Sequence, residues 1–405
     1  MKLAQINVAS YGSTGRIMCQ IQERALAEGY EAHSYFGRGN IPQGPGTYTR
    51  IEGMTSVLWH VAKGRLFDKM GHGSTVATRK LVGLLREEQP DIVHLHNLHG
   101  YYLNLDNLFG YLRESGVKVV WTLHDCWAFT GGCAYFLECG CDQWKTACRT
   151  CSQTHVFPKR YIDRSAREYD WKKELFTGLP NVMLTAPSQW LADLARQSFL
   201  KDYPVRVVHN GIDTETFQPL PPEEQAAVKA KLGMASDGKM ILGVANMWDA
   251  RKRLDAMITL AEDMKDEATV VAVGLSEKQK ANLPEGMIGI TRTENVNELA
   301  RLYGAADVFV STSVEESFSL VVAEAMACGT PIVCVDGGGC KELIEDGVGL
   351  VVPRDDRQAL KEAVQAVLIR REDFAASCRK RCVENYSRDR MVDGYIEVYK
   401  TIYEQ

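Results

Sequence analysis

The sequence lacks any apolar run that approaches the roughly 20 residues needed to span a bilayer. Its first segment, Met1–Val8, is too short and too polar for a signal peptide and is typical of a first strand instead. We therefore expect a cytoplasmic protein, whose contact with a membrane would be limited to peripheral binding on the inner face.

A strong net charge of either sign is also missing, because the formal net charge is −5 over 405 residues. Nothing resembles a nucleic-acid-binding footprint, and we expect no nucleic-acid partner. The charge is uneven, since residues 1–180 hold 21 Lys and Arg against 17 Asp and Glu. A mildly basic first half suits an anionic acceptor or a membrane surface, with ordinary variation between domains as the alternative.

Residues 55–69 place several apolar side chains beside three cations. One interpretation is a basic amphipathic helix that rests on lipid headgroups. The interpretation we favour is a surface helix that packs on its own core.

The chain is too long for one ordinary core and suits two α/β domains. Short apolar runs alternate with helical segments, which predicts parallel sheets. We expect strands at residues 2–9, 30–38, 91–97, 118–123, 181–186, 205–208, 239–244, 269–273, 288–293, 306–310 and 331–335.

The most informative stretch is Ser311–Gly339, which reads STSVEESFSLVVAEAMACGTPIVCVDGGG. It predicts the end of a strand, a helix closed by Gly329, and a second strand. Glu316 would lie just before the helix and Glu324 inside it. The amides of Phe318, Ser319 and Leu320 would be the unpaired N–H groups of the first helical turn, and such groups bind anions, above all phosphates. The alternative is that Glu316 only caps the helix and Glu324 is a solvated surface residue.

Three further patterns follow strands, where open parallel sheets bind ligands. Arg251 and Lys252 are adjacent cations that could neutralise a diphosphate, although such clusters are usually solvated. A glycine-containing turn at residues 10–16 follows the first strand, and a plain tight turn explains it equally well. His124 ends another strand, and we interpret His96 as a neighbouring cleft residue and His94 as a satisfied core histidine.

Together these patterns resemble the donor-site signature of glycosyltransferase family 4, the retaining sugar transferases of the GT-B fold. The run from Glu316 to Pro331 carries the matching Glu, Phe, Leu, Glu, Ala, Gly and Pro, and Asn210–Phe217 resembles the segment between the two domains. The resemblance implies two Rossmann-like α/β domains that face each other across a cleft. They would span residues 1–216, with a cysteine-rich insertion at 132–152, and residues 217–388, with a helix at 389–405 returning to the first domain.

The resemblance also implies roles for individual residues. The catalytic set would be His124 at the donor sugar, Arg251 and Lys252 at the diphosphate, and Glu316 at the sugar hydroxyls. Arg253 stands where the family usually has glycine. The donor-binding set would be Gly12, Gly15, Arg16, Asn246, Gly274, Phe318, Ser319, Leu320 and Glu324.

Six of the twelve cysteines fall between residues 126 and 151. Four of them could supply thiolates to a tetrahedral structural zinc, with the last two in Cys-x-x-Cys spacing. These are Cys133, Cys141, Cys148 and Cys151. Buried free thiols are the alternative. A similar loop occurs in the bacterial surface-polysaccharide branch of the family.

The implied reaction is transfer of a sugar, of the hexosyltransferase type, from a UDP- or GDP-linked donor to an acceptor hydroxyl with retained configuration. The acceptor would be a glycan or a lipid-linked glycan in capsule, exopolysaccharide or O-antigen assembly. No catalytic metal is expected, because fixed cations would replace it. The competing interpretations are a nucleotide-sugar epimerase of the same fold and a non-catalytic zinc-loop binding protein.

Overall fold

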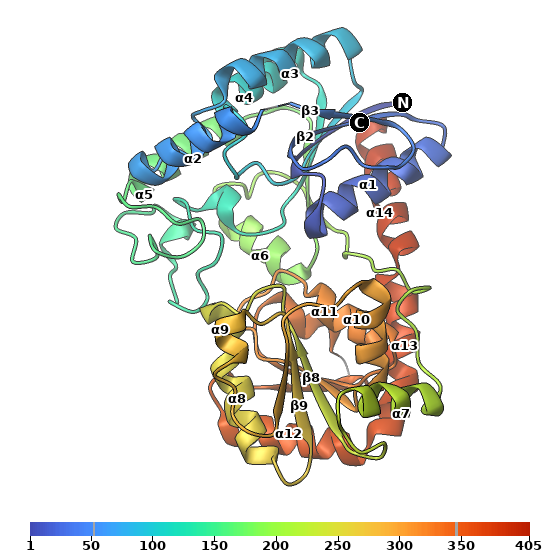
Figure 1. Ribbon diagram of the computed structural model, residues 1–405. Helices are drawn as coiled ribbons and strands as arrows, with labels where there is room; N and C mark the ends of the chain where they lie inside the picture. Colours follow the sequence, from blue (N-terminus) through green and yellow to red (C-terminus); the bar gives the residue numbers. More distant parts are fainter. Residues whose placement is uncertain (52, 345–346) are drawn as a thin grey trace. The chain divides into compact units, whose positions relative to one another are not determined.

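The computed structural model of the protein describes residues 1–51, 53–344 and 347–405, without the side chains of residues 54–56 and 63. The chain forms two compact units, each built on one sheet (Figure 1). The first consists of Met1–Val208 and Met391–Gln405, and the second of His209–Arg390. The division therefore falls a few residues from the boundaries expected at 216 and 388. Among the described helices, none is long and apolar enough to cross a membrane.

The first unit is organised around a seven-stranded parallel sheet with the order β3-β2-β1-β4-β5-β6-β7. Its strands are β1 (Lys2–Ala9), β2 (Glu31–Arg38), β3 (Thr47–Arg50), β4 (Ile92–Leu95), β5 (Lys118–Thr122), β6 (Val182–Ala186) and β7 (Val205–Val207). Its helices are α1 (Gly12–Ala27), α2 (Met54–Phe67), α3 (Thr75–Glu88), α4 (Leu105–Ser115), α5 (Ser165–Phe176), α6 (Gln189–Gln197) and most of α14 (Arg388–Glu404).

The strand period of two divides the core of this unit between the two faces of the sheet. Ala4 and Ile6 of β1 bury in one apolar cluster with α3, α4 and α6, whereas Leu3 buries in another with α1 and α14. Tyr395 and Tyr399 of α14 are fully buried in that second cluster. Burial of this apolar face explains why the last helix belongs to the first unit.

The second unit contains a six-stranded parallel sheet with the order β10-β9-β8-β11-β12-β13. Its strands are β8 (Met240–Val244), β9 (Thr269–Val273), β10 (Met287–Ile290), β11 (Val308–Ser311), β12 (Ile332–Val335) and β13 (Gly349–Val352). Its helices are α7 (Pro222–Lys231), α8 (Leu254–Met264), α9 (Glu277–Lys280), α10 (Val296–Ala305), α11 (Leu320–Ala327), α12 (Arg357–Ile369) and α13 (Arg371–Tyr386).

Helices cover both faces of this second sheet (Figure 1). Met240 and Leu242 of β8 pack with α10, α11 and α13, while Ile241 between them packs with α8 and α12. The predicted α/β class with two parallel sheets is confirmed. Because all strands of a sheet point the same way, the loops that follow them gather at one edge, where ligands of such sheets bind.

Candidate active site

The loops after β8 and β11 are bonded to each other within the second unit. The backbone N–H of Val314 donates to the carbonyl of Arg251 at 3.0 Å, and Thr312 Oγ1 donates to the carbonyl of Lys252 at 2.8 Å. Arg251 returns a bond, with Nη1 2.9 Å from the carbonyl oxygen of Glu315. These contacts fix the cation-bearing loop against the loop that carries Glu316.

Glu316 lies between the two cations that the sequence singled out. Its Oε1 accepts a hydrogen bond from Lys252 Nζ in an ion pair, and its Oε2 lies 3.9 Å from Arg251 Nη1. Burial raises the pKa of Glu316, but Lys252 and then Arg251 outweigh that effect, so the pKa lies below its ordinary value. The carboxylate is therefore ionised at neutral pH and holds both cations at one place.

The backbone of Glu316 is fixed by hydrogen bonds to the loop after β12. Its N–H donates to the carbonyl of Gly337 at 3.0 Å, and its carbonyl accepts from Gly339 N at 2.8 Å. A Cβ on Gly337 would lie 2.1 Å from the carbonyl oxygen of Ser313, so only glycine fits there. The glycines after β12 thus allow the two loops to approach.

Arg253 has different partners from the two cations before it. Its guanidinium pairs with Asp255 at 2.9 Å and with Asp355 at 2.5 Å. Its backbone lies in the left-handed region, with φ 53°. Glycine adopts this conformation without strain, which gives a physical reason for the glycine usual at this position.

Helix α11 begins later than expected. Ser319 is its N-cap, with φ 86°, and the first intrahelical bond runs from Ala323 N to Ser319 O at 3.3 Å. The amides of the first turn are therefore those of Leu320 to Val322, and the placement of Phe318 among them was wrong. Phe318 is instead buried, with its ring 5.5 Å from that of Tyr386. Ser319 Oγ is buried without a hydrogen-bond partner among the described residues.

Glu324 is buried inside the second unit, so its interpretation as a solvated surface residue was wrong. Its Oε2 accepts a hydrogen bond from the Tyr303 hydroxyl of α10 at 3.0 Å. The two carboxylates of the signature thus have different partners, and Glu316 is the one that pairs with Arg251 and Lys252.

The loops after β8 and β9 also approach closely. Gly274 has φ 92°, and a Cβ there would lie 1.7 Å from the carbonyl oxygen of Ala245. Asn246, which follows Ala245 in the sequence, is exposed. Glycine at 274 is therefore required for packing, whether or not its backbone also meets a ligand.

In the first unit the expected glycine turn is already helical, because α1 begins at Gly12. Gly15 is buried so tightly that a Cβ would lie 2.5 Å from the carbonyl carbon of Ser10. Arg16 is exposed on the same first turns. The strand-to-helix connection is thus shorter than the sequence suggested.

His124 follows β5 and contacts a buried histidine. Its Nε2 lies 3.1 Å from Nδ1 of His96, which is only 1% exposed, so His96 is buried directly behind His124. Burial lowers the pKa of His124 to about 4. His94 is fully buried, with its two ring nitrogens bonded to Tyr399 and Thr122, as expected of a core histidine.

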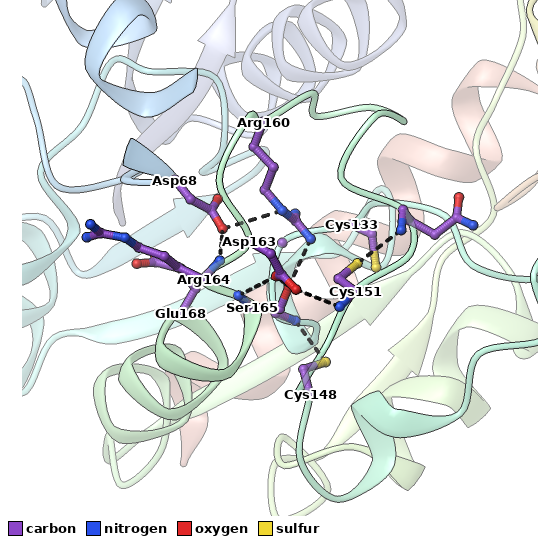
Figure 2. Close-up of polar contacts among 12 residues, drawn as sticks. Asp68, Cys133, Cys148, Cys151, Arg160, Asp163, Arg164, Ser165 and Glu168 are labelled. Carbon is purple, nitrogen blue, oxygen red and sulfur yellow. Dashed lines mark hydrogen bonds and ion pairs between the residues drawn. The ribbon is translucent and has the colours of Figure 1, made fainter. Parts of the chain in front are cut away.

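The four candidate zinc ligands line one small cavity of about 40 Å³ in the first unit. Figure 2 shows three of them, and the neighbouring Cys133 thiol holds the pKa of the Cys151 thiol below its ordinary value. Backbone N–H groups donate to Cys148 at 3.2 Å and to Cys151 at 3.4 Å. In the described part of the chain, no group of three or more His, Cys, Asp or Glu side chains is placed to hold a metal ion. The zinc prediction is thus not confirmed.

Sequence reasoning missed two residues that shape the cation loop. Asp249 caps the short turn at 250–252, accepting from Lys252 N at 3.2 Å, and Thr312 bonds the carbonyl of Lys252. An Asp three residues before Lys252 is a recognisable capping pattern. The Thr312 contact joins residues 60 positions apart, and no local pattern indicates it.

Comparisons with known proteins identify the family of this chain. The model of Glycosyltransferase Family 4 matches residues 15–216, and that of Glycosyl transferases group 1 matches residues 238–370. Alpha-maltose-1-phosphate synthase of Mycobacterium tuberculosis (strain H37Rv) is 30% identical over 276 residues, which are 57% of this chain and 70% of that protein. The chain belongs to glycosyltransferase family 4. WcaC of Escherichia coli K12, named for colanic acid biosynthesis, is 25% identical to this family 4 chain over 431 residues, covering 99% and 100% of the two proteins.

Solved structures confirm the GT-B fold for this family 4 glycosyltransferase. HepE of Anabaena, solved with UDP and glucose, superposes with a TM-score of 0.69 at 16% identity over 99% of each chain. The protein is thus a glycosyltransferase of the group 1 type, as the signature around Glu316 predicted.

Proposed function

We propose that this glycosyltransferase moves a hexose from a nucleotide diphosphate sugar to an acceptor hydroxyl with retained configuration. The observation that carries the proposal is the cluster of Lys252, Arg251 and Glu316 beside the N-terminus of α11. Two fixed cations and free helix amides at one place are what a departing diphosphate needs.

The roles follow from the chemistry of the cluster. Lys252 and Arg251 bind the two phosphates and stabilise the charge that grows as the diphosphate leaves. The buried Ser319 hydroxyl, without a partner among the described residues, supplies one more donor at the start of α11. Glu316 accepts hydrogen bonds from sugar hydroxyls, and His124 contacts the donor sugar. Because protein cations meet the phosphates, no catalytic metal takes part.

The donor is a UDP- or GDP-linked sugar. Support comes from HepE, which was solved with UDP-glucose and with UDP. The acceptor is a glycan or lipid-linked glycan of a bacterial surface polysaccharide, which agrees with the likeness to WcaC over nearly the whole of both chains.

The acceptor proposal includes peripheral membrane contact through α2. This helix buries Val57 against its own unit but leaves Leu58 61% and Trp59 64% exposed. Leu66 and Phe67 near its end are exposed as well. Exposed aromatic and aliphatic side chains beside cations fit the interface of an anionic bilayer.

The function is tested by incubating the purified protein with a panel of radiolabelled nucleotide sugars, with and without glycan and lipid-linked acceptors. Label that moves to an acceptor, with the anomeric configuration of the donor, supports the proposal. Change of the donor sugar without any acceptor would indicate an epimerase. Binding of a donor with no turnover on any acceptor would indicate a non-catalytic binding protein.

A further inference from the structure

A series of hydrogen bonds connects His124 to Gln5. The donor and acceptor of each bond can be assigned by starting at Gln5. This residue of β1 is fully buried. Gln5 Nε2 donates to the carbonyl of Met18 at 3.0 Å and to Ser34 Oγ at 3.0 Å. A carbonyl can only accept, so the amide nitrogen of Gln5 must be the atom that faces Met18.

A second contact agrees with that orientation. Ser34 has one hydroxyl proton, which it donates to Oε1 of Gln22. Gln22 is oriented in turn, because its Nε2 donates to the carbonyl of Thr47 at 3.1 Å. Ser34 Oγ can therefore only accept from Gln5, and Gln5 Oε1 is left to face His96.

The orientation of Gln5 fixes the proton on His96. Gln5 Oε1 lies 3.2 Å from His96 Nε2, and an amide oxygen can only accept, so His96 Nε2 carries a proton. Burial holds the pKa of His96 well below its ordinary value, so the ring is neutral and has one proton only. His96 Nδ1 is thus a bare nitrogen that accepts.

The position of the proton on His124, the candidate catalytic histidine, can be assigned in the same way. His124 Nε2 lies 3.1 Å from the bare Nδ1 of His96 and must donate to it. With a pKa of about 4 because of burial, His124 is also neutral at pH 7, and its single proton is on Nε2. Its Nδ1 has no hydrogen-bond partner in the described part of the chain.

We propose that Gln5 and His96 are positioning residues that hold His124 in the tautomer with the proton on Nε2, so that Nδ1 accepts a hydrogen bond from a hydroxyl of the transferred sugar. This rests on the proposed contact between His124 and the donor sugar. A sugar hydroxyl donates readily to a bare imidazole nitrogen, whereas the opposite tautomer would present N–H and select a different hydroxyl geometry. The buried amide of Gln5 therefore influences binding of the donor sugar through the His96 and His124 rings.

The tautomer is measured directly on the full-length protein with ¹⁵N-labelled histidine, by two-bond ¹⁵N–¹H correlation NMR at pH 7. The chain has nine histidines, and His96→Gln and His124→Gln each assign one set of signals by its loss. We expect both rings to be neutral with the proton on Nε2. A proton on Nδ1 of His124, or on both of its nitrogens, overturns the proposal. This spectrum needs no substrate, so it decides the tautomer even if no donor is turned over.

Gln5→Met and Tyr399→Phe form a matched pair of buried variants. The first removes the acceptor that orients His96, and the second removes only the hydroxyl that bonds His94 Nδ1 at 2.6 Å. Gln5→Met should mix the two tautomers of His124 and raise the donor KM about three- to tenfold, the range that one hydrogen bond is worth, with kcat nearly unchanged. Tyr399→Phe should leave both readouts unchanged.

A loss of folded protein would lower kcat without moving KM, so it cannot imitate the expected result. If Gln5→Met keeps the parent tautomer and donor KM, or if Tyr399→Phe changes them equally, the positioning role is wrong. Mixed tautomers of His124 in Gln5→Met with an unchanged donor KM refute only the sugar contact. If Gln5→Met does not fold, the spectrum of the unaltered protein still decides the tautomer.

Discussion

Replacing Lys252 with alanine should disable the proposed donor site while leaving the fold in place. The Lys252 side chain is 15% exposed and its ammonium group is paired with Glu316, whose side chain is 14% exposed. Its removal leaves a phosphate oxygen of the donor without its partner and Glu316 with Arg251 as its remaining cation, at 3.9 Å. Both losses act on the same step, departure of the diphosphate.

The expected loss is about 2–4 kcal/mol of transition-state stabilisation, which is the usual value of one preorganised donor to a developing anion. At about 1.4 kcal/mol per decade, this is roughly a hundredfold to a thousandfold in rate. Arg251→Ala should be similarly severe. Since Lys252 and Glu316 are in contact, Lys252→Ala combined with Glu316→Gln should lose less than the sum of the two single losses.

Arg253→Ala is the matched control. Its guanidinium pairs with Asp255 and Asp355, which are 67% and 68% exposed, and such exposed pairs contribute about 0–1 kcal/mol to stability. Initial rates at saturating donor, together with thermal unfolding of each variant, should rank Lys252 and Arg251 as severe and Arg253 as mild. EDTA should not slow the parent enzyme. If Arg253→Ala is the most damaging change, or if EDTA stops the reaction, the diphosphate is not where we place it.

Three further outcomes are expected. The pKa of Glu316 lies below its ordinary 4.5, so its ion pairs stabilise the fold at neutral pH, and that contribution disappears as the pH falls below about 4.5. The free energy of unfolding in urea, measured at pH 7 and pH 4, should therefore fall less on acidification for Glu316→Gln than for the parent. If the four cysteines of the 132–152 loop bind zinc, protein purified without chelators should carry about one equivalent by elemental analysis, whereas metal-free protein with titratable thiols would favour free cysteines. Leu58→Ser with Trp59→Ser should weaken sedimentation with anionic vesicles several-fold and leave transfer to a water-soluble acceptor unchanged; equal sedimentation of variant and parent would count against a membrane-facing α2.

Much of the fold was predictable because its strands are short, apolar and separated by helices. The alternation in β8, with Met240 and Leu242 on one face and Ile241 on the other, needs helices on both sides of the sheet. The order of the strands and the short edge strands β3 and β13 were not predictable in the same way. Both edge strands have four residues, too few for a clear period, and β3 carries only one buried side chain.

The residues of the candidate site also fall into those that the sequence could predict and those that it could not. Arg251, Lys252 and Glu316 could be predicted because a local signature marks each of them, and the structure brings all three together. The start of α11 could not, because Ser319 has a left-handed backbone and its side chain makes no capping hydrogen bond, unlike the usual serine cap. The burial of Glu324 against Tyr303 joins two helices and leaves no periodic trace in the sequence.

The charge in the cluster suggests why a glutamate is kept between two cations. Two adjacent cations without an anion would repel each other and move apart in water, and ordering them on binding would cost free energy. Glu316 holds them in place before the donor arrives, so the stabilising groups need little rearrangement when the diphosphate departs. Asp249 Oδ2 also lies 3.6 Å from Arg251 Nη2, so two carboxylates balance the two cations, and the N-terminus of α11 adds about half a positive charge. This excess favours the more negative of the two states, the departing diphosphate, over the bound donor. We therefore infer that Glu316 serves the leaving group as much as the sugar.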